Sequence, residues 1–402
     1  MGFWNNREDK PTLVTGTHAF YINALLRGLV MSLVGVFTPI FVYREVVQIS
    51  DVKTALICVA GYYLLLRLTV FVSSIPISWI IERLGFRKSI LVSMVLLICN
   101  LLTLSLAGGH VWLIPISSIL AGLVAPFYWI ARHSAVSQDA VKSGMGRTMG
   151  VLATMESLSS LLSPFVGGVI IMEWGYPVLY AISAVLLVLS IVPLWYMPHH
   201  THRNGASING FAHYLRDKRY FHQEVGMMGL VGHDYGLLII WPLLMSLMHY
   251  STKTVGGVYS IIAAVWVAFR LITGNLFDKL HNKKGLADET LFAISSIGVF
   301  VFIVARIWIT SIEQIVVLEI ATAFFSIIFS GFLLSYFQLG GRRMGSIAYY
   351  VYSEMIYSIF AVVLMVIMML GAEYNIWREI IMMVCASWVL ISVVVARESN
   401  LK

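Results

Sequence analysis

The chain has 402 residues, of which 59% are hydrophobic and only 12% are charged, and its formal net charge is +7. A soluble domain is about half apolar and about a quarter charged, so this chain has too few charged side chains to cover a surface that faces water. The composition argues against a soluble enzyme, a nucleic-acid-binding protein and a disordered scaffold. It predicts an all-α polytopic membrane protein.

Twelve stretches are apolar and long enough to cross a bilayer as helices, which takes about 20 residues. In chain order they cover 19–43, 54–81, 89–108, 112–132, 147–170, 178–197, 223–249, 254–277, 290–309, 313–336, 346–371 and 376–396. The longest gap divides them six and six. We therefore predict an N-terminal lobe of six helices (1–197), a cytoplasmic central loop (198–222) and a C-terminal lobe of six helices (223–402). Aromatic and basic residues mix in 208–221 of the loop, which favours a helix lying in the membrane interface; an unstructured linker is the alternative.

The placement of Lys and Arg predicts the orientation. Nineteen of the 27 Lys and Arg residues fall in loops that are cytoplasmic if the N-terminus is inside, and four fall in the outer loops. Cytoplasmic loops carry the excess of positive charge, so we predict that both termini are cytoplasmic. The basic charge then reflects topology and contact with anionic lipid, without a nucleic-acid partner. We expect an integral protein of the plasma (inner) membrane.

Two short motifs recur at nearly one spacing in the two predicted lobes. The segment after the second span, 82–88, reads ERLGFRK, and the segment after the eighth span, 278–284, reads DKLHNKK at an offset of 196. The fifth and eleventh spans open with GRTMG (146–150) and GRRMG (341–345) at an offset of 195. Two matches in corresponding loops indicate that the lobes are a parallel repeat.

The stretch from Gly274 to Lys284 resembles the signature loop of the major facilitator superfamily, and the likeness covers essentially the whole chain. The resemblance implies two lobes that rock around a central site, with charged loop residues that gate the motion. The loop residues concerned are Glu82, Arg83, Arg87, Lys88, Gly274, Asp278, Lys279, Lys283 and Lys284. The first copy departs from the pattern, because Ser78 stands where glycine is expected and Glu82 replaces aspartate. The alternative is that both loops only carry topogenic charge.

A second motif lies in the fifth span. Ser163, Pro164, Gly167 and Gly168 are similar to the Gly-Pro-x-x-Gly-Gly signature of the antiporter branch of the family, with Ser163 in place of the first glycine. Small residues let membrane helices approach closely, so we expect these residues at the interface between the lobes. Ordinary helix packing explains them equally well.

Eight ionisable residues fall inside the predicted spans, where each must face a partner or a wet cavity. They are Arg27, Arg67, Glu156, Asp234, Arg270, Arg306, Glu319 and Glu354. Arg306 and Glu319 are placed near the outer boundary, where Arg306 can extend to the interface. The other six, with Tyr350 and Tyr357 on the same helical face as Glu354, are our candidates for binding substrate or protons. Buried ion pairs that only fix the packing are the alternative.

The candidates divide by chemistry. A desolvated carboxylate can take up a proton near neutral pH, and a nearby arginine opposes this, so Glu156 and Asp234, followed by Glu354, are the proton candidates. Arg27 is the candidate for an anionic group of the substrate. The aromatic run from Phe127 to Trp129 either stacks on a substrate ring or anchors its helix at the interface.

These features predict a secondary active transporter of a small organic solute that works by alternating access, is coupled to protons and exports its substrate as an antiporter. Proton-coupled uptake of an organic anion, lipid flipping, another coupling ion, and a non-transporting receptor or assembly protein stay open as alternatives. No hydrolase motif or phosphate-binding loop occurs in the sequence, so we expect no enzyme activity, no cofactor and no metal. The expected partners are the solute, protons or another ion, and lipid. Analogy with the family implies a monomer.

Overall fold

The computed structural model describes residues 13–143, 154–196, 206–281, 286–344 and 347–393, and no strand occurs among them. The helices of the first part of the chain are α1 (Leu13–Val34), α2 (Thr38–Val47), α3 (Val52–Leu106), α4 (Leu113–Ser143), a helical stretch over 154–160, α6 (Ser163–Leu194) and α7 (Ile208–Arg216). Those of the second part are α8 (Lys218–Tyr235), the π-helical η1 (Gly236–Ile240), α9 (Trp241–Leu247), α10 (Thr252–His281), α11 (Leu286–Ala305), the short η2 (Arg306–Trp308), α12 (Ile312–Met344), α13 (Ile347–Glu373) and α14 (Trp377–Ile391).

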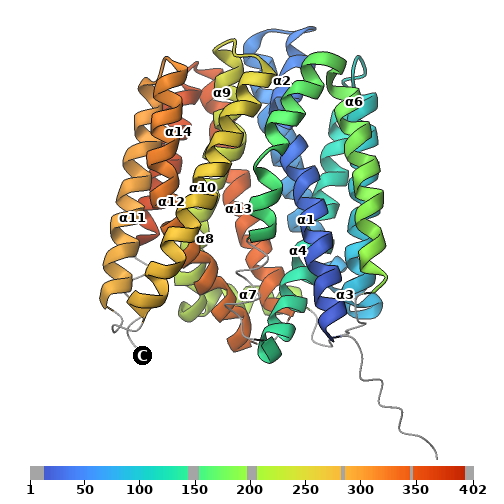
Figure 1. Ribbon diagram of the computed structural model, residues 1–402, viewed down its shortest axis with the longest axis vertical. Coiled ribbons are helices and arrows are strands. Elements are labelled where there is room, and N and C mark those ends of the chain that lie inside the picture. The colour runs from blue at the N-terminus through green and yellow to red at the C-terminus, as the bar shows by residue number, and fades with distance from the viewer. Residues whose placement is uncertain (1–12, 144–153, 197–205, 282–285, 345–346, 394–402) are drawn as a thin grey trace, which may run out of the picture.

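The long helices run side by side along the long axis of the molecule (Figure 1). Helices α1 to α6 lie on the right in this view, and most of the later helices lie on the left. We call the end that carries α2 and α9 the upper end. Helix α13 packs against both α3 and α4, so the two parts of the chain meet along the middle of the bundle.

Two of the long helices are broken by a glycine. Gly85 in α3 has φ 80° and ψ 164°, and Gly175 in α6 has φ 82° and ψ 174°. A residue with a Cβ rarely adopts such a positive φ, which explains glycine at both breaks. Gly85 lies inside the 82–88 motif, so the break separates the second predicted span from the third.

Nine stretches of the described chain are long and apolar enough to cross a membrane. One of them, Thr154–Leu194, contains the break at Gly175, and the run from α8 to α9 and the 15-residue α14 fall outside the nine. The all-α polytopic architecture is thereby confirmed, whereas the count of twelve spans and the boundaries of the two lobes stay predictions.

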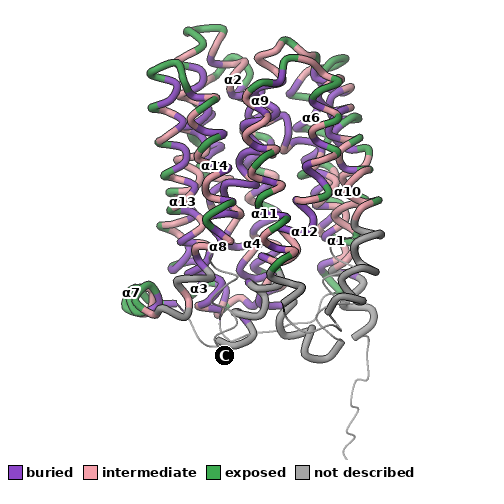
Figure 2. The backbone as a smooth tube through the Cα atoms, turned by 90° about the vertical axis from the view of Figure 1, so that its left-hand side faces the viewer, coloured by how far each residue is buried: buried purple, intermediate pink, exposed green. Residues whose placement is uncertain are grey.

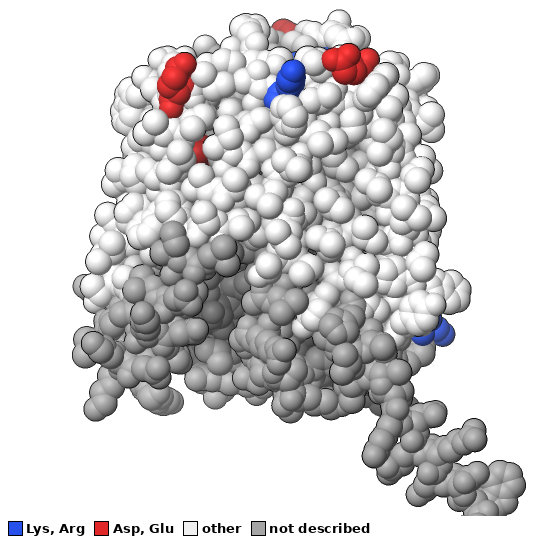
Figure 3. Space-filling view, in the orientation of Figure 1, with Lys and Arg blue, Asp and Glu red and all other residues white. Residues whose placement is uncertain are grey.

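The outer surface of the bundle is apolar, as the bilayer requires. Large aliphatic side chains such as Val72, Leu162 and Val185 are exposed by 63–70%. On the face shown in Figure 3, the charged side chains of the described residues gather toward the upper end and at the lower right, and the described surface between them shows none. Buried residues line the inner sides of the helices (Figure 2).

Helix α7 lies apart from the bundle axis, at its lower edge (Figure 2). The predicted interfacial segment is therefore helical over Ile208–Arg216. Its Tyr214 is buried, and the hydroxyl donates a hydrogen bond to the buried carboxylate of Glu224 in α8. Trp79 of α3 donates through Nε1 to the carbonyl of Ala206 at 2.9 Å, which ties the start of this segment to α3.

Candidate functional site

A first group of charged and aromatic residues surrounds Arg27 of α1. Arg27 is buried, and its guanidinium carbon lies 3.5 Å from the centre of the Tyr128 ring in α4. Arg132, also buried, forms an ion pair of 2.5 Å with Glu156 and lies 4.8 Å from the centre of the Trp129 ring. Two predicted candidates, Arg27 and Glu156, therefore share one site with Arg132, which the sequence analysis did not select as a candidate.

The local fold explains this grouping. Side chains four residues apart lie on the same face of a helix, and α4 carries Tyr128 and Arg132 at that spacing. The fourth span was predicted to end at 132, but α4 continues to Ser143. Arg132 consequently lies inside the helix and points into the protein, because Glu156 is there to pair with it.

His133 joins this group to the second part of the chain. Its ring stacks on Trp129 and on Tyr350 of α13, with 5.5 Å between ring centres and 20° between ring planes in both pairs. Phe337 of α12 packs edge-on against the same ring at 5.2 Å. The predicted candidate Tyr350 thus belongs to the first group.

A second group forms around Arg67 of α3. Its Nε donates to the hydroxyl of Tyr235 in α8 at 2.5 Å, and its guanidinium lies 4.6 Å from the centre of the Tyr357 ring in α13. The hydroxyl of Tyr357 donates to Asp234 at 3.1 Å. Glu354 interacts electrostatically with Arg67 from the same helix as Tyr357. Four predicted candidates are brought together here, and Tyr235 is the member that the sequence analysis missed.

The buried pair of Arg306 and Glu319 corrects a prediction. Their side chains are exposed by 0% and 2%, and Nη2 of the arginine donates to the carboxylate at 2.6 Å. Arg306 therefore does not extend to the membrane interface. Its short helix η2 turns the side chain inward, over the Trp241 ring at 5.1 Å. His233 interacts electrostatically with Glu319 and contacts Asp234 at 3.1 Å, so this pair adjoins the second group.

The residues of the fifth-span motif pack against α10 near the upper end. The hydroxyl of Thr252 donates to the carbonyl of Gly168 at 3.2 Å, and a Cβ on Gly168 would lie 2.9 Å from the carbonyl carbon of Thr252. On the facing helix, Gly256 packs against the carbonyl of Pro164. Gly167 packs against α1, and the buried Ser163 hydroxyl donates to a carbonyl of the preceding turn.

The two loop motifs differ in how far the structure describes them. In the first copy Glu82 and Arg87 are half-buried, Arg83 and Lys88 are exposed, and Arg87 lies 6.0 Å from the Trp195 ring. In the second copy the backbone of Gly274, Asp278 and Lys279 belongs to α10, but their side chains, and that of the site candidate Arg270, lie outside the described part. Lys283 and Lys284 lie outside the described residues altogether.

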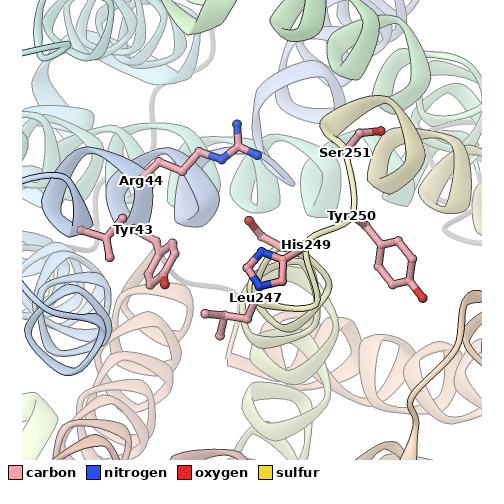
Figure 4. Close-up of a pocket in the computed structure, with 8 residues that line it drawn as sticks. Tyr43, Arg44, Leu247, His249, Tyr250 and Ser251 are labelled. Carbon is pink, nitrogen blue, oxygen red and sulfur yellow. The ribbon is translucent and has the colours of Figure 1, made fainter.

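A pocket of about 390 Å³ opens at the upper end between α2 and the segment that follows α9 (Figure 4). Tyr43 and Arg44 line it from α2, and His249, Tyr250 and Ser251 line it from the other side. His249 has φ 64°, an uncommon value for a residue other than glycine. The sequence analysis did not predict this pocket.

Comparison with known proteins identifies the family of the chain. The family model of the Major Facilitator Superfamily matches residues 20–363. MFS-type transporter ppzB of Metarhizium rileyi is 28% identical over 118 residues, which are 29% of this chain and 24% of that protein. The same transporter of Metarhizium majus is 27% identical over 118 residues, 26% of its length. The match thus spans about a quarter of these curated relatives.

Solved structures agree over nearly the whole chain. The outward conformation of the transporter FucP, the fucose:proton symporter of E. coli, has a TM-score of 0.67 at 13% identity, covering 96% of this chain and 99% of that one. The human organic anion transporter MFSD10 has a TM-score of 0.69 at 10% identity, covering 96% and 100%. At such identities the likeness concerns the fold. With the family model extending from the first predicted span into the eleventh, it shows that the chain is a member of the Major Facilitator Superfamily.

Proposed function

We propose that this transporter is a secondary active carrier of a small organic solute and that protons drive it through the group around Arg67. The observation that carries the proposal is that Arg67 of α3 is held by side chains of α8 and α13, which belong to the other predicted lobe. Alternating access separates and rejoins the lobes at a central site. The partners of Arg67 therefore change whenever the carrier converts between its inward-facing and outward-facing states.

Two carboxylates, those of Asp234 and Glu354, lie in this group. Asp234 accepts a hydrogen bond from Tyr357, whose ring lies beside Arg67, and Glu354 interacts with Arg67 electrostatically. A carboxylate in a poorly solvated site exchanges a proton when the distance to a neighbouring cation changes. Rocking of the lobes moves Arg67 relative to both acids. This movement couples proton binding to the change between the inward-facing and outward-facing states. Glu156 is the equivalent acid for the group around Arg27.

We infer the direction of transport from the motif of the fifth span. The antiporter-like residues Pro164 and Gly168 pack against α10, at a contact where lobes must separate. We propose export of the solute in exchange for protons, from a protein in the plasma (inner) membrane with both termini cytoplasmic. Uptake of an organic anion is the second candidate, favoured by the two buried arginines Arg27 and Arg132.

The test is substrate-dependent proton flux into liposomes that contain the purified protein and an internal pH-sensitive dye, challenged with pooled metabolites and drugs. Asp234→Asn should abolish the flux while substrate exchange across the membrane continues, because exchange needs no net proton movement. Glu373→Gln is the matched control, since that carboxylate pairs with Lys53 on the exposed upper end and should leave the flux unchanged.

The sign of the flux distinguishes antiport from symport. Proton flux that survives both Asp234→Asn and Glu354→Gln with an unchanged pH dependence would remove the coupling role of this group. Flux that only Glu156→Gln abolishes would transfer the role to the group around Arg27.

A further inference from the structure

The group around Arg27 carries more positive than negative charge. Arg27 and Arg132 are exposed by only 7% and 6%, and among the described residues Glu156 is the one carboxylate in contact with either of them. Glu156 bonds to Arg132, and Nε of Arg27 is buried without a hydrogen-bond partner in the described part of the chain. A buried guanidinium without a counter-ion is costly. The site therefore has an excess positive charge that one more anionic group would balance.

The surroundings of these arginines are flat and aromatic. The Tyr128 and Trp129 rings lie against the two guanidinium groups. Next to them, His133 stacks nearly parallel on Trp129 and on Tyr350, so three rings from the two parts of the chain form one stack. Aromatic faces favour contact with another planar ring. A ligand that combines a carboxylate with a planar ring would satisfy both features.

We propose that this group is the substrate site and that its ligand is a planar aromatic carboxylate, which binds Arg27 and displaces Glu156 from Arg132. The inference rests on the proposed transport function, because it names the class of solute that is carried. Glu156 is suited to being displaced, since its side chain is 41% exposed whereas that of Arg132 is 8% exposed.

The ion pair itself allows an opposite assignment, in which Glu156 is the counter-ion of a cationic solute. The two assignments differ in the effect of Glu156→Gln. If the ligand is an anion, removing the internal competitor exposes Arg132 and should tighten binding about tenfold or more. If the ligand is a cation, the same substitution removes its partner and abolishes binding.

The experiment measures binding directly, by thermal stabilisation of the full-length protein in detergent, and so does not depend on proton coupling. The probes are benzoate, 1-naphthoate and indole-3-acetate, each compared with its neutral primary amide, together with benzylamine as the cationic probe. A ligand that binds only the folded protein raises its stability with concentration. At least one carboxylate should stabilise the protein, and its amide should not.

Variants assign the binding to the site. Arg27→Gln and Arg132→Gln should each weaken binding of the carboxylate by about 10- to 100-fold, the usual loss for a hydrogen bond to a charged group. Arg44→Gln, at the upper pocket, is the matched control and should bind as the wild type does. Arg27→Lys should also weaken binding, because a lysine cannot reproduce both the planar contact with Tyr128 and the forked hydrogen bonds.

Three results would overturn the proposal: equal stabilisation by carboxylate and amide, stabilisation by benzylamine that Glu156→Gln abolishes, or no stabilisation by any carboxylate of the panel. These results are separable from failure of the proposed function. Carboxylate binding without proton flux would support the substrate site and contradict the proposed proton coupling. Proton flux with other solutes but no carboxylate binding would support the coupling and contradict the substrate site.

Discussion

The ion pair between Arg306 and Glu319 should be worth far more to stability than a second pair of the same length. Both this pair and the pair between Lys53 and Glu373 have 2.6 Å between nitrogen and oxygen. Their exposure differs, at 0% and 2% for the first pair and 43% and 52% for the second. Glu319→Gln leaves a guanidinium buried without a counter-ion and should cost about 3–5 kcal/mol. Glu373→Gln removes a solvated pair and should cost about 0–1 kcal/mol.

The assay is equilibrium unfolding in mixed detergent micelles, followed by tryptophan fluorescence for the wild type and each variant. A double substitution, Arg306→Leu with Glu319→Leu, should be less destabilised than Glu319→Gln alone, because no charge is then left uncompensated. Equal losses for Glu319→Gln and Glu373→Gln would refute the reasoning, since burial would not then decide the strength of the pair. If the double variant lost as much unfolding free energy as the two single substitutions added together, the loss would come from packing and not from charge.

Two further substitutions test the helix contacts. Gly168→Val should lower the free energy of unfolding by about 1–3 kcal/mol, because its side chain would meet the backbone of Thr252; Gly257→Val, where a Cβ has room, should cost less, and a larger loss at that control would contradict the assignment. Asp51 caps α3 by accepting a hydrogen bond from the backbone of Thr54, and hydrogen bonds from that residue hold the pKa of the carboxyl below its usual value. A lowered pKa means that the cap stabilises the folded state above about pH 4 and is lost as the pH falls. Asp51→Ala should therefore lower the unfolding temperature near neutral pH and have little effect near about pH 3, and a difference that grows in acid would have the wrong sign.

The sequence predicted the architecture because the bilayer imposes it. Spanning segments need long apolar runs, and these are visible without knowledge of the packing. The breaks that separate spans were also visible where a loop is charged, as around Gly85. The ends of helices inside the protein cannot be located in the same way, because a charged residue within a helix looks like the end of a span. Arg132 shows the consequence: α4 continues past it, since Glu156 supplies the charge that permits its burial.

The sequence predicted which residues belong to the candidate site but not which of them contact one another. Arg67, Asp234, Glu354 and Tyr357 were selected because ionisable groups and their helical neighbours are costly in a membrane, and the structure brings them together. Which acid meets which arginine depends on how helices distant in sequence are rotated, and periodicity within one helix carries no information about that rotation. The spacing of four residues between Trp129 and His133 was the available signal for the aromatic stack.

Aromatic rings accompany the three buried arginines of the described residues and the half-buried Arg67. The guanidinium groups of Arg27, Arg67, Arg132 and Arg306 lie over Tyr128, Tyr357, Trp129 and Trp241 at 3.5–5.1 Å from the ring centres. Such contacts favour a desolvated cation without fixing it in a charge pair. Arg306 has in addition a fully buried carboxylate and is held in place.

Arg27 and Arg67 have rings and hydroxyl groups as their nearest partners, and their carboxylates interact only at longer range. An arginine stabilised by a ring keeps its hydrogen-bonding edge available, and it can exchange a hydroxyl for a carboxylate without being left uncompensated. In the proposed transport cycle these rings allow Arg27 and Arg67 to change partners. For Arg27 the ring is Tyr128, which the sequence analysis also allowed as a membrane anchor. The same rings explain why lysine, with its compact and strongly hydrated charge, should not replace either arginine.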